Sequence, residues 1–270
     1  MDIQFAKMNG AGNDFVVIDN RSGEFSLDRE TIERLCDRHR GIGADGFLAV
    51  EPAEGAADFR MRYYNSDGGE AEMCGNGARC FARFAARLMD ISPHALSFET
   101  QAGPITAVLS GDSVTLDMGI PQDQRAAQTL RLADREMNIH FLNTGVPHAV
   151  AFLENVEEID IRSYGASLRY HEAFSPKGTN ANFAQVMEDG TIVLRTYERG
   201  VEDETLACGT GVCATALLHA LETEAPSPVL VKVRGGDTLS VSFEKTESGG
   251  FQKVRLTGPA DFVFEGTISL

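Results

Sequence analysis

One short element occurs twice in the chain and decides its architecture. Residues 70–80 read EAEMCGNGARC, and residues 204–213 read ETLACGTGVC. Each copy contains Cys-Gly-x-Gly, a Glu four residues before its first Cys, and a second Cys shortly after. The offset between Cys74 and Cys208 is 208 − 74 = 134 residues, about half of the 270-residue chain. We therefore predict two pseudo-symmetric domains that arose by duplication, each with one cysteine facing a shared cleft.

The repeat extends beyond the cysteine motif. The segment YYN at 63–65 aligns with YER at 197–199 at the same offset of 134 residues. The segment GADGF at 43–47 aligns with TNANF at 179–183 at an offset of 183 − 47 = 136 residues. These matches indicate that the whole half-chain is repeated.

Each cysteine motif precedes a predicted helix. Phe81, Phe84, Ala85 and Leu88 recur at helical spacing, and residues 210–222 carry a second apolar stripe. The first backbone N–H groups of a helix have no intrahelical partner, so both motifs offer donors to an anion. A helix N-terminus also lowers the pKa of an adjacent thiol from its usual value of about 8.5.

Short apolar strands alternate with a few helices, which indicates an α/β (α+β) fold. A helix is predicted over 28–40, and the segment GIPQDQ at 119–124 is the best interdomain linker. We expect an N-terminal domain over 1–119, with residues 262–270 crossing back to it, and a C-terminal domain over 120–261. The predicted strands cover 2–8, 14–18, 46–50, 58–64, 96–101, 104–110, 113–118, 139–143, 148–153, 229–233, 237–244, 251–257 and 261–267.

Composition limits the partners. A formal net charge of −16 and a pI near 4.8 argue against binding to nucleic acid or to an anionic membrane. The N-terminal segment has no basic and apolar signal sequence, and no apolar run approaches the ~18 residues of a membrane helix. We expect a cytoplasmic protein with a small-molecule substrate.

The five cysteines do not form a disulfide framework, because their number is odd and the chain lacks a signal peptide. Their spacing is not that of zinc ligands, so we expect no metal. Cys36, Cys80 and Cys213 fit small buried side chains. For Cys74 and Cys208 the alternatives are the same structural role or a redox disulfide.

Two thiols that face one cleft suit chemistry with two mirror-related sides. One cysteine, as thiolate, could remove an α-proton while the other, as thiol, delivers a proton to the opposite face. A carboxylate held between the two helix N-termini would be stabilised as negative charge develops on it. This is racemisation or epimerisation without a cofactor.

Seven motifs carry a resemblance to a known family over essentially the whole chain. They are KMNGAGNDF (7–15), RHRGIGADG (38–46), NSDG (65–68), MCGNGARC (73–80), GVPH (145–148), YERG (197–200) and ETLACGTG (204–211). The chain resembles the diaminopimelate epimerases, isomerases that interconvert LL- and meso-diaminopimelate in lysine and peptidoglycan-precursor biosynthesis without pyridoxal phosphate. The resemblance implies barrel-like, mostly antiparallel sheets around central helices, an active site in the interdomain cleft, and a homodimer.

The resemblance also assigns roles residue by residue. Cys74 and Cys208 would be the catalytic acid/base pair, and His148 and Glu198 would tune their pKa values. Contacts from the helix starts to the reacting carboxylate would come from Gly75, Asn76, Gly209 and Thr210. The other polar groups of the substrate would be held by Asn13, Asn65, Asn180, Glu198 and Arg199.

The chain departs from one common form of the family pattern at two positions. Gly46 stands where some members have Gln, and Val146 stands where many have Asn. Either change could remove a side-chain contact to the substrate.

Three other functions remain open from the sequence. Proline and hydroxyproline racemases carry a His where this chain has Asn76, and Asp-Arg-Ser/Thr-Pro where it has Glu198-Arg199-Gly200. A racemase of another amino acid is a closer alternative. A non-catalytic amino-acid-binding or thiol-redox protein is the third alternative, and it would not exchange the α-proton of an amino acid for deuterium from the solvent.

Overall fold

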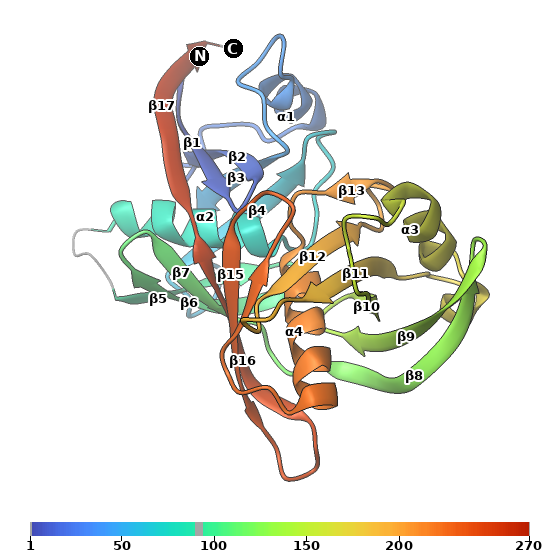
Figure 1. Cartoon of the computed structure of the whole chain (residues 1–270). Helices are drawn as coiled ribbons and strands as arrows, with labels where there is room; N and C mark the ends of the chain where they lie inside the picture. The colour runs from blue at the N-terminus through green and yellow to red at the C-terminus, as the bar shows by residue number, and fades with distance from the viewer. Residues whose placement is uncertain (1, 90–93, 270) are drawn as a thin grey trace. The chain divides into compact units, whose positions relative to one another are not determined.

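The computed structural model describes residues 2–89 and 94–269 (Figure 1). The chain divides into two compact units, the first made of Met1–Leu116 and Gly258–Leu270 and the second of Asp117–Thr257. Strands dominate both units and helices are few, so the predicted α+β class is confirmed. The predicted domain limits at 119–120 and 261–262 stay a prediction. No helix within residues 2–89 and 94–269 is long and apolar enough to span a bilayer.

The strands of the first unit form one sheet in the order β17-β1-β2-β3-β4-β5-β6-β7. Neighbours are antiparallel except the β2–β3 and β4–β5 pairs. Parallel neighbours need a crossover connection, which the helices α1 (Arg29–Cys36) and α2 (Gly75–Arg87) supply. The strands are β1 (Asp2–Gly10), β2 (Asn13–Asp19), β3 (Gly46–Glu51), β4 (Phe59–Asn65), β5 (Ala95–Thr100), β6 (Gly103–Ser110), β7 (Ser113–Asp117) and β17 (Asp261–Ser269).

The strands of the second unit pair in the order β8-β9-β10-β11-β12-β14-β15-β16, with the short β13 beside β12. The parallel pairs are β10–β11 and β12–β14, and helices α3 (Ile161–Arg169) and α4 (Gly209–Thr223) lie in their connections. A 3₁₀ turn, η1 (Glu172–Phe174), follows α3. The strands are β8 (Gln122–Leu132), β9 (Arg135–Asn143), β10 (Pro147–Phe152), β11 (Asn180–Val186), β12 (Ile192–Tyr197), β13 (Glu204–Thr205), β14 (Val229–Lys232), β15 (Thr238–Lys245) and β16 (Phe251–Pro259).

The two sheets repeat one pairing pattern. Starting from β1 and from β9, each runs antiparallel, parallel, antiparallel, parallel, antiparallel, antiparallel. The predicted repeat is therefore visible in the topology. The register corrects one detail: Gly46 pairs with Asn65, whereas Asn182 pairs with Thr196. If Phe47 and Phe183 are equivalent, Asn65 corresponds to Thr196, so the alignment of 63–65 with 197–199 cannot hold at the same time.

A buried helix lies against the inner face of each sheet. Helix α2 contacts β1 to β4 and β6, and α4 contacts β9 to β12, β14 and β15 (Figure 1). Every residue of α4 from Gly211 to Ala220 is buried, as expected of a helix that is apolar on all sides. These helices are the central helices that the resemblance implied, and the side chains of Phe81 in α2 and Phe183 in β11 are buried.

The structure differs from the local expectations at several places, among them strands β11 and β12, which lie outside the predicted strand ranges. The helix predicted over 28–40 ends at Cys36, because the Asp37 carboxylate accepts from the backbone N–H groups of His39 and Arg40. The expected linker 119–124 is partly strand, since β8 begins at Gln122. Strand β8 itself was not predicted, because it is exposed along almost its whole length and lacks apolar alternation.

Candidate active site

In the first unit, Cys74 lies directly before a buried helix. Its backbone is extended (φ −136°, ψ 119°), and α2 begins at Gly75. The next side chain, Asn76, is buried and donates from Nδ2 to Asn13 Oδ1 at 2.6 Å. A Cβ at Gly10 would lie 2.7 Å from the Asn76 carbonyl oxygen, so the end of β1 can approach the helix start only without a side chain there.

The Asn13 amide is held at both ends. Its Oδ1 accepts from Asn76, and its Nδ2 donates to Asp45 Oδ2 at 3.1 Å. Asn76 is fixed in turn, because its Oδ1 accepts from Arg79 Nη2 at 2.9 Å. Arg79 is fully buried and donates from Nε to the Pro259 carbonyl oxygen at 3.1 Å. The orientation of Asn13 is therefore set by the fold.

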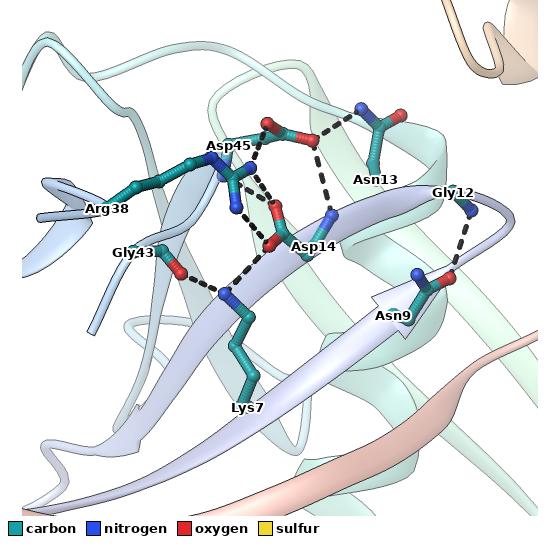
Figure 2. Close-up of polar contacts among 8 residues, drawn as sticks. All are labelled: Lys7, Asn9, Gly12, Asn13, Asp14, Arg38, Gly43 and Asp45. Atoms are coloured by element: carbon teal, nitrogen blue, oxygen red, sulfur yellow. Dashed lines mark hydrogen bonds and ion pairs between the residues drawn. The ribbon is translucent and has the colours of Figure 1, made fainter.

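An ion cluster lies behind Asn13 (Figure 2). Asp14 accepts from Lys7, at 2.7 Å, and from both terminal nitrogens of Arg38. Arg38 also donates to Asp45 Oδ1 at 2.8 Å, and Lys7 donates to the Gly43 carbonyl oxygen. Burial alone would raise the pKa of Asp14, but the hydrogen bonds from Arg38 and Lys7 outweigh it and hold that pKa well below its usual range.

Asn65 ends β4, opposite Gly46 in β3. Its Oδ1 accepts from the Tyr63 hydroxyl at 2.8 Å. A Cβ at Gly46 would lie 2.9 Å from both the Tyr63 ring and the Tyr64 carbonyl oxygen. The Tyr63 ring and the Tyr64 carbonyl oxygen thus leave no room for a side chain at residue 46 unless one of them shifts.

In the second unit, Cys208 stands in the same context. Its backbone is extended (φ −124°, ψ 105°), α4 begins at Gly209, and the cysteine is buried. The sulfur lies 3.5 Å from Thr210 Oγ1, which lies 2.9 Å from His148 Nε2. Thr144 donates from Oγ1 to the Thr210 carbonyl oxygen at 2.8 Å. The start of α4 is thereby attached to the β9–β10 turn.

His148 is a fully buried imidazole. Its Nδ1 lies 3.1 Å from Asn182 Nδ2. Burial, with a smaller effect of the Arg199 charge, lowers the pKa of His148 to about 3. The ring is therefore neutral at physiological pH.

Three further predicted residues lie together where the neighbouring strands β11 and β12 begin and end, respectively. Asn180 starts β11, donates from Nδ2 to the Pro147 carbonyl oxygen at 3.0 Å, and accepts from the Arg199 backbone N–H at 2.8 Å. Glu198 Oε2 accepts from Thr205 Oγ1 at 2.8 Å. Burial raises the pKa of Glu198, and the Thr205 hydrogen bond opposes this shift.

The other cysteines lie in the cores. Cys36, Cys80 and Cys213 are buried, and burial raises the pKa of both Cys36 and Cys80 to about 12. All five cysteines are thiols. Among the residues that the structure describes, no three His, Cys, Asp or Glu side chains gather as a metal site requires.

Each unit therefore carries what we call a half-site: a cysteine at the N-terminus of a buried helix, with oriented polar side chains beside it. The first half-site contains Cys74, Gly75, Asn76 and Asn13, and the second contains Cys208, Gly209, Thr210 and His148. Chemically, each half-site can bind an anionic oxygen at the helix start and exchange a proton at sulfur.

Comparison with known proteins identifies the family. The family described as "Diaminopimelate epimerase" matches residues 5–123 and 140–263. The diaminopimelate epimerase of Chlorobaculum tepidum is 44% identical over 267 residues, which cover 97% of this chain and 100% of that protein. That of Aquifex aeolicus is 42% identical and covers 99% of this chain and 98% of its own length.

The chain belongs to the diaminopimelate epimerase family. Solved structures show the same fold at low identity. A PhzF-family phenazine biosynthesis protein of Bacillus anthracis has a TM-score of 0.75 at 16% identity and covers both chains fully. A hydroxyproline epimerase of Agrobacterium vitis, with bound trans-4-hydroxy-L-proline, has a TM-score of 0.69 at 17% identity, over 100% of this chain and 93% of that one.

Sequence reasoning left three residues that contact the half-sites without a role. Asp45 and Arg79 lie inside motifs shared with the family, and Asn182 lies inside the repeated TNANF segment. Their side chains fix Asn13, Asn76 and His148, respectively. The motifs signalled that these positions matter, but only the structure shows what each contacts.

Proposed function

We propose that this protein is a diaminopimelate epimerase, which interconverts LL- and meso-2,6-diaminopimelate in lysine and peptidoglycan-precursor biosynthesis. The observation that carries the proposal is the duplicated half-site, a cysteine before a buried helix in each unit. It occurs in a chain that is 44% identical, over nearly its whole length, to a curated diaminopimelate epimerase. The chemistry needs two opposed thiols and neither pyridoxal phosphate nor a metal.

In the proposed reaction, the two half-sites lie on opposite sides of the substrate α-carbon. Either Cys74 or Cys208, as thiolate, takes the α-proton, and the other cysteine, as thiol, gives a proton to the opposite face. The charge left on the α-carbon spreads onto the reacting carboxylate. The N–H groups of the two helix starts, at Gly75, Asn76, Gly209 and Thr210, donate to that carboxylate and stabilise the charge.

Specificity for diaminopimelate rests on the second amino-acid end of the substrate. We assign the recognition of this distal L-centre to Asn65, Asn180 and Arg199, with Asn13 completing the polar contacts. Arg199 suits a carboxylate, which it can grip with two parallel hydrogen bonds. Glu198 suits an ammonium group, because the substrate would supply a counter-charge to this partly buried carboxylate, whose pKa burial raises.

The proposed site lies between an N-terminal domain (1–119 with 262–270) and a C-terminal domain (120–261). Closure on the substrate would exclude water and keep the thiolate reactive. Because β8 begins at Gln122, we place the hinge in the non-strand residues 118–121.

The protein is further proposed to act as a cytoplasmic homodimer. The acidic charge of −16 suits a chain that binds neither nucleic acid nor anionic membranes. Two apolar side chains of β17, Val263 and Phe264, are about half exposed and are candidates for burial against a second copy. Sedimentation at several protein concentrations measures this assembly.

Chiral chromatography tests the activity. Reduced protein, without pyridoxal phosphate or added metal, is incubated with LL-diaminopimelate and with a panel of other L-amino acids. We expect meso-diaminopimelate from the wild type and from Cys36→Ala, and none from Cys74→Ser or Cys208→Ser. Near wild-type turnover in either Ser variant would disprove the two-thiol mechanism. Turnover of another amino acid alone would keep the mechanism and change the substrate, with Gly46 and Val146 as the positions to examine.

A further inference from the structure

A buried chain of hydrogen bonds leads from β12 to the sulfur of Cys208. Thr196 Oγ1 donates to Asn182 Oδ1 at 3.0 Å, and Asn182 Nδ2 lies 3.1 Å from His148 Nδ1. On the other side of the ring, His148 Nε2 lies 2.9 Å from Thr210 Oγ1, and that oxygen lies 3.5 Å from Cys208 Sγ.

The orientation of the Asn182 amide is fixed by groups that can only accept. Its Nδ2 contacts the carbonyl oxygens of Ala149, at 3.0 Å, and Asn180, at 3.4 Å. A carbonyl oxygen has no proton, so the atom facing these two must be the NH₂ group. The third neighbour of that NH₂ group, His148 Nδ1, must then be an acceptor.

The tautomer of His148 follows. An accepting Nδ1 carries no proton, so the proton of the neutral ring sits on Nε2. A proton added to Nδ1 would point at the Asn182 NH₂ group. The charge of Arg199 also disfavours the imidazolium. The Nε2–H group therefore donates to Thr210 Oγ1.

The Thr210 hydroxyl, which accepts from His148, still has its own proton to donate. Its other side-chain contact in the described structure is Cys208 Sγ. A thiolate can only accept, so a hydroxyl that donates to the sulfur favours the thiolate form. We propose that Asn182 is a positioning residue that locks His148 as the Nε2–H tautomer, so that Thr210 donates to the Cys208 thiolate.

The packing of α4 agrees with this arrangement. A Cβ at Gly211 would lie 2.6 Å from Asn182 Oδ1 and 3.3 Å from His148 Cε1. The second glycine of the Cys-Gly-x-Gly motif thus allows the helix start to lie against the Asn182–His148 pair. The inference deepens the proposed function, on which it rests, because it gives Cys208 a built-in preference for the base form.

Nitrogen NMR of the wild-type protein tests the tautomer without substrate. The protein is labelled with ¹⁵N-histidine, and the His148 signals are assigned by their loss in His148→Gln. We expect an unprotonated Nδ1 and a protonated Nε2 across neutral pH. A protonated Nδ1 would overturn the proposal. In Asn182→Asp, where a carboxylate replaces the donor, we expect the proton to appear on Nδ1.

Thiol alkylation tests the last step. The pH midpoint of Cys208 alkylation by iodoacetamide is measured in a Cys74→Ser background, where Cys36, Cys80 and Cys213 are buried and burial raises the pKa of Cys36 and Cys80 to about 12. At pH values below the midpoint, Thr210→Val should lower the thiolate fraction of Cys208 about tenfold, which is the effect of losing one hydrogen bond to a charged group. Thr210→Ser should restore it.

The matched control is Thr215→Val on the same helix. The Thr215 hydroxyl is buried and has no hydrogen-bond partner among the described residues, so its removal should leave the midpoint unchanged. A Thr210→Val midpoint equal to that of the wild type would overturn the proposal. Neither the NMR measurement nor the alkylation midpoint uses diaminopimelate. Both can therefore be interpreted even if the protein proves to have no epimerase activity, which a separate assay measures.

Discussion

Removal of the Asp14 carboxylate should destabilise the first unit strongly. Asp14 is the partner of Lys7, whose ammonium lies 2.7 Å from Asp14 Oδ2 and is almost fully buried, with a side-chain exposure of 8% (Figure 2). Asp14→Ala leaves this ammonium with the Gly43 carbonyl oxygen and without a counter-charge. A buried charge without its partner is among the costly defects of a folded protein.

The expected loss can be estimated from the exposures. Breaking a buried pair by removing one partner costs about 3–5 kcal/mol. The Arg38 side chain is 55% exposed, so the loss of its bond to Asp14 adds only about 0–1 kcal/mol. We therefore expect the free energy of unfolding to fall by about 3–5 kcal/mol, a large share of the roughly 5–15 kcal/mol typical of a protein.

Urea unfolding, followed by circular dichroism, measures this loss. Lys7→Met combined with Asp14→Ala should be more stable than Asp14→Ala alone, because the unpaired charge is gone. The matched control is Asp19→Ala, which removes a pair with Arg21 at the same 2.7 Å but at the surface, and it should cost less than about 1 kcal/mol. A loss below about 1 kcal/mol in Asp14→Ala, or no recovery in the double variant, would refute the reasoning.

Three other outcomes are expected. Gly211→Ala should lower kcat/KM at least tenfold, because the added Cβ would lie 2.6 Å from Asn182 Oδ1. The control Gly250→Ala, whose Cβ would lie 3.4 Å from its nearest neighbour, should leave kcat/KM unchanged, and steady-state kinetics compare the two variants. The pKa of Asp14 is lower in the folded than in the unfolded protein, so its ionisation stabilises the fold fully above the unfolded pKa of about 4, and this stabilisation is lost as pH falls through the folded pKa. Urea titrations below pH 4 should therefore show that the free energy of unfolding depends less steeply on pH in Asp14→Ala than in the wild type. If Cys74 and Cys208 act on one α-carbon, the activity should disappear in air and return with a reductant, equally in the wild type and in Cys36→Ala. Activity that neither treatment changes would argue against facing thiols.

The sequence predicted those elements whose signal is local. The helices after Cys74 and Cys208 follow from apolar spacing, and the β1–β2 hairpin follows from the glycine-rich turn before Asn13. Helix α3 was missed although Asp160 accepts from the Ser163 backbone N–H as an N-cap, because only a few of its residues are buried. Strand β8 has no apolar alternation to reveal it.

The contacts within the half-sites could not be predicted, because they depend on pairing across long stretches of chain. Asn182 meets His148 only through the parallel register of β10 with β11, and Asp45 meets Asn13 only through that of β2 with β3. Neither register can be derived from residue types alone. The opposition of Cys74 and Cys208 across one α-carbon is a further step, and it stays a prediction.

Proton NMR of LL-diaminopimelate in D₂O with the reduced protein tests the two-thiol mechanism most directly. We predict that deuterium replaces the proton at the reacting α-carbon as meso-diaminopimelate appears, without pyridoxal phosphate or metal, and that Cys74→Ser and Cys208→Ser each stop the conversion. No exchange in the reduced wild-type protein, with this compound or any other amino acid, would contradict the mechanism and leave the duplicated cysteine motif with a structural or redox role.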